Sequence, residues 1–329
     1  MQEMIKAEQA FQAMNRLGKA RVPFLFAFNF DLTQAFIVEH PERQQEILYK
    51  TPLGTNCPIQ EQELRSKAPE LTTSPITYEN YLKRFEVIRK GQLDGDTFLA
   101  NLTVETPIKT HLSLEEIYAY SQAKYKLLVP GNFVSFSPES FVKIDLSSSR
   151  IETRPMKGTI NADLPQAEEK ILNDPKEKAE HYTIVDLLRS DLARIATHIA
   201  VERFRYIDKL TTNKGGLLQV SSLITGQLPK ESASQLGDIF RQLLPAGSIS
   251  GAPKPATIRL IHKAEKESRG FYSGVFGLFD GKIVDSGVLI RFIAQKGSQM
   301  YYHSGGGITI HSDPQSEYRE VLDQIYIPT

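Results

Sequence analysis

The chain has 329 residues and carries 39 basic (Lys and Arg) and 39 acidic (Asp and Glu) side chains, which gives a formal net charge of zero. This length is enough for one large domain or two ordinary ones with a well-buried core, and the balanced charge gives no electrostatic basis for binding nucleic acid or an anionic membrane. The single cysteine, Cys57, excludes an intrachain disulfide and a cysteine-based zinc site. No stretch has the apolar character of a signal peptide or the length of a membrane span, so we expect a cytoplasmic protein.

The first 76 residues predict a short N-terminal piece. Its expected elements are an amphipathic helix over residues 3–18 and strands over residues 22–30 and 35–39. Residues 40–75 contain five prolines in an irregular polar stretch, which is typical of a loop-rich join. We therefore divide the chain into residues 1–76 and a main body over residues 77–329, both within one globule.

The main body predicts helices mixed with antiparallel-looking runs of strands. The expected helices cover residues 77–91, 113–123, 175–202, 231–244, 253–268 and 314–325. The expected strands cover residues 97–104, 133–136, 141–144, 150–154, 217–224, 271–279, 282–284, 287–295 and 299–304. This mixture favours an α+β fold over a doubly wound parallel sheet. Neither a GxGxxG dinucleotide loop nor a GxxxxGK[ST] phosphate loop occurs.

Two pairs of glutamates open two of the predicted helices. Glu177 and Glu180 begin one helix, and Glu317 and Glu320 begin the last one. Residues three apart share a helix face, so each pair presents two carboxylates together. Acids in a first helical turn commonly only complement the helix dipole. If both pairs converge, they would suit a hard divalent cation such as Mg²⁺, which takes one or two protein carboxylates and keeps positions for other oxygens.

Glycine clusters provide two further candidate sites. Gly305, Gly306 and Gly307 end a predicted strand, where backbone N–H groups could bind a carboxylate. A tight bend explains the three glycines equally well. Residues 247–254 (GSISGAPK) open a helix, whose positive end is available to an anion.

Several single residues have both a common structural interpretation and a chemical one. Arg291 lies in an apolar strand, where it either meets a buried acid or grips a ligand carboxylate. Tyr272 lies on a glycine-flanked strand and is more typical of core packing. Glu139 occupies a turn between two apolar strands, where a glutamate is normally solvated.

Lys157 is predicted at a strand end, beside Gly158, which lets backbone approach a ligand closely. In isolation it would be an exposed surface lysine. Taken together with the acidic helix starts, the glycines and Arg291, it suits a site for a small di-acid bound through Mg²⁺.

The motifs, in their order, resemble the chorismate-utilising enzyme family, which includes anthranilate synthase component I, aminodeoxychorismate synthase component I, isochorismate synthase and salicylate synthase. The resemblance extends over residues 77–329. Its blocks are residues 95–98, 137–141, 153–159, 180–194, 247–254, 269–277, 290–291 and 305–320. It implies two large, mostly antiparallel sheets packed as a sandwich, with helices outside and the site between the sheets.

The resemblance also implies roles for the candidate residues. Glu180 and Glu317 would hold Mg²⁺, with Glu177 and Glu320 as alternative or outer ligands, and the metal would anchor the ring carboxylate of chorismate. The second carboxylate, on the enolpyruvyl group, would be held by a set of donors that comprises Arg291, Tyr272 and the amides of Gly305, Gly306 and Gly307.

The remaining implied roles concern the reacting end of chorismate. Gly158 and Thr159 would line the substrate. Glu139 would be the general acid that helps the C4 hydroxyl leave.

Lys157 is the residue that discriminates among the reactions of the family. A lysine here resembles the aminodeoxychorismate synthases, whereas anthranilate synthases have alanine. The implied role is attack on C2, followed by addition of ammonia at C4 to give 4-amino-4-deoxychorismate for folate precursor synthesis. Leu99 stands where water-adding members carry a lysine base, so isochorismate and salicylate formation are disfavoured.

No glutaminase nucleophile block and no lyase region occur in the sequence. We therefore expect ammonia from a separate glutamine amidotransferase subunit and a separate aminodeoxychorismate lyase downstream. Two alternatives stay open, namely anthranilate synthase component I and a catalytically altered chorismate-binding protein.

Overall fold

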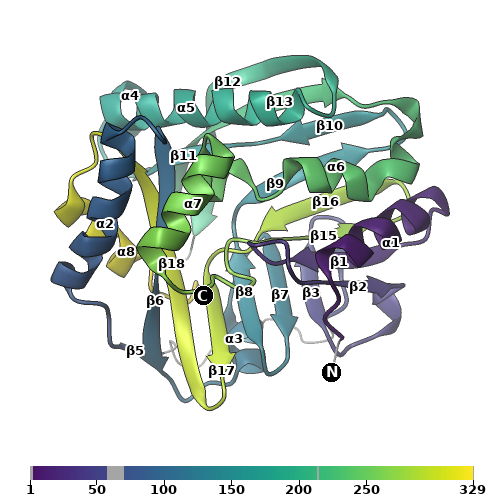
Figure 1. Cartoon of the computed structure of the whole chain (residues 1–329), viewed down its shortest axis with the longest axis horizontal. Helices are drawn as coiled ribbons and strands as arrows, with labels where there is room; N and C mark the ends of the chain where they lie inside the picture. Colours follow the sequence, from purple (N-terminus) through teal and green to yellow (C-terminus); the bar gives the residue numbers. More distant parts are fainter. Residues whose placement is uncertain (1–2, 58–69, 213–214, 329) are drawn as a thin grey trace.

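The computed structural model describes residues 3–57, 70–212 and 215–328, which build two nine-stranded sheets with helices around them (Figure 1). The strand pairs are antiparallel, as between β1 and β15 in the first sheet and between β6 and β18 in the second. In the view of Figure 1 the first sheet runs across the upper part of the molecule and the second runs down it. This architecture confirms the predicted α+β fold of two packed sheets.

The first sheet has the strand order β11-β13-β10-β9-β16-β15-β1-β2, with β12 paired to β13. Its strands are β1 (Phe24–Phe28), β2 (Ala35–Glu39), β9 (Ser140–Asp145), β10 (Arg150–Thr153), β11 (Met156–Asn161), β12 (Thr197–Thr212), β13 (Gly215–Gln227), β15 (Val275–Phe279) and β16 (Ile283–Val288).

The second sheet has the strand order β14-β6-β18-β17-β8-β7-β3-β4, with β5 paired to β6. Its strands are β3 (Leu48–Thr51), β4 (Gly54–Thr55), β5 (Thr72–Thr73), β6 (Leu99–Lys109), β7 (Tyr125–Val129), β8 (Phe133–Ser137), β14 (Gly251–Ala252), β17 (Phe292–Lys296) and β18 (Gln299–Thr309).

Helices cover the outer faces and edges of the sheets. The α-helices are α1 (Ala7–Lys19), α2 (Tyr78–Leu93), α3 (Leu114–Tyr120), α4 (Ala167–Asn173), α5 (Pro175–Leu192), α6 (Leu236–Leu243), α7 (Lys254–Glu265) and α8 (Pro314–Asp323). Short 3₁₀ turns are η1 (Pro41–Arg43), η2 (Lys230–Gln235) and η3 (Gly247–Ile249).

The N-terminal residues lie within the first sheet and its core. All five residues of β1 are fully buried, and β1 is hydrogen-bonded between β15 and β2. The apolar face of α1 packs against the same core, where Phe11 stacks on Phe28 at 4.5 Å between ring centroids. The stretch predicted as irregular over residues 40–75 contains strands β3, β4 and β5, and its residues 58–69 lie outside the described residues.

Several predicted elements were wrong in extent, and two of them bear on the topology. The helix expected over residues 175–202 ends at Leu192, and the next strand, β12, begins at Thr197. Residues of β12 such as Ile199 and Val201 pack at the edge of the core, where β-branched side chains suit a strand. The strand expected over residues 287–295 is two strands, because the chain leaves the first sheet after Val288 and enters the second at Phe292.

Three functional candidates therefore sit on different elements than predicted. Lys157 lies inside β11 rather than at the end of the preceding strand. Tyr272 lies in the turn before β15 rather than on the strand. Gly305, Gly306 and Gly307 continue β18 instead of ending it, since they pair with β6.

Candidate active site

A β-bulge positions Lys157. Strand β11 pairs with β13, and its register shifts between Lys157 and Thr159. The intervening Gly158 has φ +77°, a left-handed conformation that favours glycine. Such a bulge re-aims side chains along a strand. The Lys157 ammonium lies 3.8 Å from Glu180 Oε2, with the lysine side chain 28% exposed, so the predicted nucleophile is paired with a predicted metal ligand.

Glu139 faces the same space as Lys157. It follows β8 at the turn into β9, and both residues line a cavity of about 50 Å³. The Ser248 hydroxyl donates a 2.6 Å hydrogen bond to Glu139 Oε1. Burial raises the pKa of Glu139 above its usual range, against the opposing effects of Ser248 and the Lys157 charge. A carboxyl that keeps its proton toward higher pH is suited to general-acid chemistry.

The acidic helix starts are built as their sequences predict. Proline occupies the first turn of both α5 and α8. The side chain of Asp174 caps α5 by accepting from the Glu177 amide, and the side chain of Asp313 caps α8 by accepting from the Ser316 amide.

The carboxylates of the two helices approach the site from different sides. A Cβ atom added at Gly306 would lie 3.6 Å from Glu317 Oε2 and 3.7 Å from Glu320 Oε1, so both α8 carboxylates converge over a position without a side chain. On the α5 side, Glu177 Oε2 lies 3.0 Å from the position that a Cβ atom added at Gly158 would occupy.

Lys157 links these two sides. Its ammonium lies beside Glu180 and 3.9 Å from the point where a Cβ at Gly307 would stand. Leu99 meets the same point at 3.1 Å with an apolar methyl group, so this part of the site offers no basic side chain at that position.

The donor set fits Mg²⁺ completed by a ligand. Among the residues that the structure describes, no three His, Cys, Asp or Glu side chains gather closely enough to form a metal site by themselves. The space at Gly306 and the two carboxylate oxygens around it nevertheless form a cradle open to a cation. Because Mg²⁺ keeps several positions for water and substrate oxygens, two protein carboxylates are a sufficient protein contribution.

The glycine amides are not equivalent. Gly305, Gly306 and Gly307 stand opposite Thr103, Leu102 and Asn101 of β6. The amides of Thr103 and Asn101 donate away from β18, to Glu265 and Ser250. In an antiparallel ladder, bonded and non-bonded pairs alternate. The Gly306 amide therefore belongs to the sheet, and the amides of Gly305 and Gly307 point to the opposite side.

Arg291 lies where the chain crosses between the sheets, with φ +50°. It is half-buried and donates from Nη1 to the Gln324 carbonyl at 3.0 Å, while Gln324 Oε1 accepts from the Gly305 amide at 3.2 Å. Tyr272 is buried, and its burial raises the pKa of the phenol to about 12 against the opposing charges of Arg269 and Arg291. Gln324 thus connects Arg291 to Gly305, and the charge of Arg291 also acts on the Tyr272 phenol.

A family model for chorismate binding enzymes matches residues 7–327. The chain belongs to the chorismate-binding enzyme family. It is similar to an uncharacterized PabA-like protein of Haemophilus influenzae, with 47% identity across 95% of this chain and 94% of the relative. It is 28% identical to aminodeoxychorismate synthase component 1 of Escherichia coli, across 88% of this chain and 67% of that protein.

Solved structures of the family share the fold. Anthranilate synthase component I of Streptococcus pneumoniae superimposes with a TM-score of 0.65 and 27% identity, covering 80% of this chain and 60% of that one. A relative named aminodeoxychorismate synthase and one named anthranilate synthase thus match at similar identity, so these comparisons do not choose between the two names. No helix in the described part of the chain has the length and apolarity to cross a membrane.

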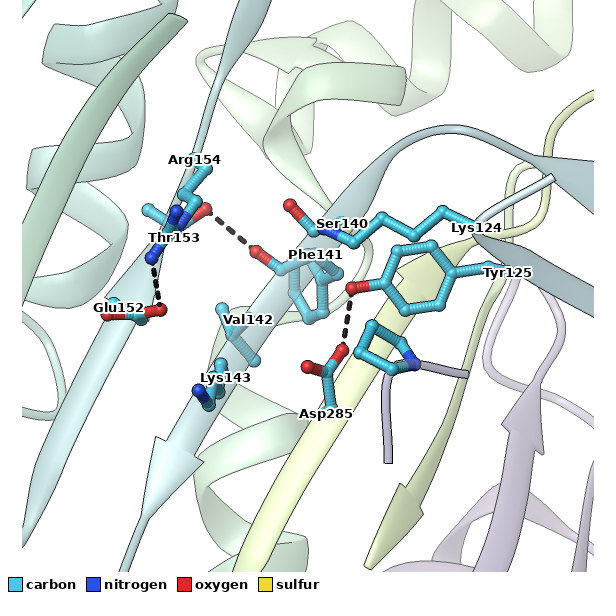
Figure 2. A pocket seen from close by; sticks show the side chains of 11 residues that line it. Lys124, Tyr125, Ser140, Phe141, Val142, Lys143, Glu152, Thr153, Arg154 and Asp285 are labelled. Carbon is cyan, nitrogen blue, oxygen red and sulfur yellow. Dashed lines mark hydrogen bonds and ion pairs between the residues drawn. The ribbon is translucent and has the colours of Figure 1, made fainter. Parts of the chain in front are cut away.

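Two larger cavities flank this family site. One of about 600 Å³ lies between the start of α5 and the ends of β6 and β18, and it is lined by Glu180, Gln92 and the exposed Phe98. The other, of about 200 Å³, lies on the far side of Phe141 and is shown in Figure 2. There the Tyr125 hydroxyl donates to Asp285 at 2.6 Å.

Sequence reasoning missed two residues of the site, Ser248 and Gln324. Ser248 belongs to the block over residues 247–254, whose density of small residues was a signal for a special loop but not for a contact with Glu139. Gln324 gives no signal in the sequence, since glutamine near a helix end is common.

Proposed function

We propose that this member of the family is an aminodeoxychorismate synthase component I, which converts chorismate and ammonia to 4-amino-4-deoxychorismate and water. The observation that carries the proposal is the position of Lys157. Its amine shares a cavity with Glu139 and contacts Glu180. A nucleophile that shares a small cavity with a carboxyl whose pKa is raised by burial is the arrangement that substitution at the ring requires.

The first half of the reaction forms a bond to Lys157. The neutral amine attacks C2, the ring double bonds shift, and the C4–O bond breaks. Glu139 gives its proton to the departing oxygen, which leaves as water. The Lys157 nitrogen lies 3.8 Å from Glu180 Oε2, so the two side chains have to separate before the nitrogen can bond to C2.

The second half releases the enzyme. Ammonia attacks C4, the double bonds shift back, and the bond between C2 and the lysine nitrogen breaks. The added nitrogen loses a proton, Glu139 regains the proton that it gave to the departing water, and Lys157 is released as the neutral amine. Leu99 offers no basic group to activate water at this point, so hydration at C2 is not supported by the chain.

Glu180 and Glu317 would hold Mg²⁺, with Glu177 and Glu320 alongside. When bound, Mg²⁺ would balance and orient the ring carboxylate. Arg291 and the outward amides of Gly305 and Gly307 would bind the enolpyruvyl carboxylate, for which Gln324 has to release Gly305. Gly158 and Thr159 would line the reacting edge, since both belong to the bulge beside Lys157.

The proposal includes partners and a cellular role. Ammonia would come from a separate glutamine amidotransferase subunit, and a separate lyase would convert the product for folate precursor synthesis in the cytoplasm. The similarity to a protein named PabA-like and to aminodeoxychorismate synthase component 1 supports this choice.

Product analysis tests the reaction. The protein is incubated with chorismate, Mg²⁺ and ammonium, and the products are separated by chromatography and identified by mass. We expect 4-amino-4-deoxychorismate that retains the enolpyruvyl group. Fluorescent anthranilate would instead identify anthranilate synthase component I, and the absence of turnover with intact chorismate binding would indicate an altered chorismate-binding protein.

Lys157 variants test the covalent step. Lys157→Ala is expected to lose ammonia-dependent amination by about a thousandfold or more, because the nucleophile is gone. Lys157→Arg keeps a cation near Glu180 but stays protonated, so it should be equally inactive. Intact-protein mass spectrometry without ammonia should show the adduct on wild type only. Full amination by Lys157→Ala would rule out the covalent role.

A further inference from the structure

The general acid proposed above has a single close hydroxyl partner on a separate segment. Ser248 belongs to η3 and donates to Glu139 Oε1 at 2.6 Å across 109 residues of sequence. Once the carboxyl is ionised, a hydrogen bond of this length is charge-assisted, and such bonds are among the stronger ones in proteins. Because Oε1 accepts from Ser248, a proton on the neutral carboxyl would reside on the other oxygen, Oε2.

The segment that carries Ser248 is held firmly in place. Lys254, at the start of α7, forms a 2.7 Å ion pair with Asp191 of α5 and donates to the Leu243 carbonyl at 2.8 Å. Gly247 packs so closely on α5 that an added Cβ would stand 2.9 Å from Asp191 Oδ2. These contacts fix the loop before any ligand arrives.

Hydrogen bonds within the loop complete its attachment. The Ser250 hydroxyl donates to the Ala246 carbonyl at 2.8 Å, and Arg269 donates to the Ile249 carbonyl at 2.9 Å. Ser248 is therefore held by its neighbours on both sides, and its hydroxyl is presented to Glu139 in a defined orientation.

Most of the other groups that line the cavity at Glu139 are apolar. The exceptions are Lys157, Ser140 and Thr153, and the Thr153 hydroxyl donates to the Phe141 carbonyl. Helix α5 contributes Ile184 and Leu188 to the cavity wall, and β9 contributes Phe141. Strand β11 contributes Lys157, the cation that acts on Glu139. In surroundings with few polar groups, a hydrogen bond from one hydroxyl has a larger effect on a carboxylate than it has in water.

We propose that Ser248 is a positioning residue for proton transfer, which orients Glu139 through Oε1 and stabilises the carboxylate that forms when Oε2 gives up its proton. This inference rests on the proposed role of Glu139. In the step concerned, the proton moves from Oε2 to the C4 oxygen of the substrate, the C4–O bond breaks and water leaves. Ser248 keeps its own proton throughout.

Kinetics of Ser248 variants test the inference. Ser248→Ala is expected to lower kcat about tenfold to a hundredfold, the range of a hydrogen bond to a charged group. Without the donor the carboxylate is less stable, so the alkaline limb of the pH profile of kcat/KM should move to higher pH. Ser248→Thr keeps the hydroxyl and should restore both quantities toward wild type.

Ser250→Ala is the matched control. It removes a buried hydroxyl from the same loop, two residues away, without touching Glu139. We expect its alkaline limb to stay where the wild-type limb lies. If Ser248→Ala and Ser250→Ala gave the same change in kcat with no shift in either limb, the effect would be structural and the inference would be overturned.

A titration separates this inference from the proposed reaction. The Glu139 carboxyl carbon can be followed by ¹³C NMR against pH without substrate, using Glu139→Gln for assignment. The pKa of Glu139 should rise in Ser248→Ala and remain near the wild-type value in Ser248→Thr and Ser250→Ala. An unchanged value in Ser248→Ala would overturn the inference even if amination is confirmed. The expected shift together with a different reaction product would overturn only the proposed function.

Discussion

At the scale of single residues, the site depends on positions where a side chain is missing as much as on those where one is present. Gly306 keeps the space between Glu317 and Glu320 open, and Gly158 lets β11 bulge so that Lys157 reaches Glu180. Both glycines act by leaving space for neighbouring side chains. The effect of substituting them can therefore be measured separately from catalysis.

We predict that Gly306→Ala weakens Mg²⁺ binding by tenfold or more and changes stability little. The added methyl would stand 3.6 to 3.7 Å from two carboxylate oxygens, where it takes the place of the cation without a severe clash. Strand alanine is tolerated at a residue without positive φ. Calorimetric titration with Mg²⁺ and a thermal melt check both parts. Wild-type affinity in the variant would contradict the cradle at Gly306.

His303 gives a residue-scale prediction about pH. Burial lowers the pKa of His303 from 6.5 to about 3, aided by the charges of Lys296 and Arg269, and these effects outweigh Glu105 at 3.6 Å. As the pH falls, His303 in the unfolded chain therefore binds a proton near pH 6.5, whereas His303 in the folded chain binds one only near pH 3. Stability contributed by neutral His303 is present above pH 6.5 and is lost as the pH falls toward 3.

The measurement is the urea midpoint of unfolding at pH 7 and pH 4.5. The drop between these pH values should be smaller in His303→Gln than in wild type. The exposed His311 supplies the control, and His311→Gln should behave like wild type. Equal drops in wild type and His303→Gln would show that His303 does not carry the effect.

At the scale of elements, α5 connects the glutamates at its own start to the loop that carries Ser248. Its first turns present Glu177 and Glu180, and its last turns present Asp191 to Lys254. The ion pair joins side chains that are only 9% and 11% exposed, so it fixes α5 against the start of α7.

We predict that Asp191→Ala destabilises the protein by about 3–5 kcal/mol, because Lys254 would remain as a buried charge without its partner. The double variant with Asp191→Leu and Lys254→Met should be much closer to wild type, since it removes both charges together. Equilibrium unfolding in urea measures both. A double variant as unstable as Asp191→Ala would show that packing, rather than the unpaired charge, decides the loss.

At the scale of the whole molecule, the site lies where the two sheets meet. The chain passes from the first sheet to the second at residues 289–291, which places Arg291 between them. Lys157 comes from the first sheet and Gly305 to Gly307 from the second. The site therefore requires both sheets in their native arrangement.

Residues 77–329 expressed alone should fail to fold. Without β1 the first sheet loses the strand paired with β15, and the fully buried Phe24, Phe26 and Phe28 leave a gap in its core. We expect aggregation or a loss of cooperative unfolding, seen by sedimentation and thermal circular dichroism. A soluble fragment that unfolds cooperatively would show that the N-terminal piece is dispensable.

The sequence by itself determined the elements that depend on neighbouring residues. The capped, proline-initiated starts of α5 and α8, their glutamate pairs and most strand positions follow from spacing and local propensity. The order of the motifs was enough to indicate the family. The sequence did not show where the helix that begins at residue 175 ends, or that residues 283–296 form two strands. Both features depend on how the chain packs into two separate sheets.

Only the tertiary structure decided what the functional groups touch. The contact of Lys157 with Glu180 and of Ser248 with Glu139 joins residues on different elements, the latter 109 positions apart in the chain. No local pattern encodes such a contact, since it depends on how the bulge in β11, the crossover at Arg291 and the anchored loop are placed by the packed core. The sequence was enough to identify the chemical groups of the site. Which groups contact one another depends on how the two sheets fold around the site.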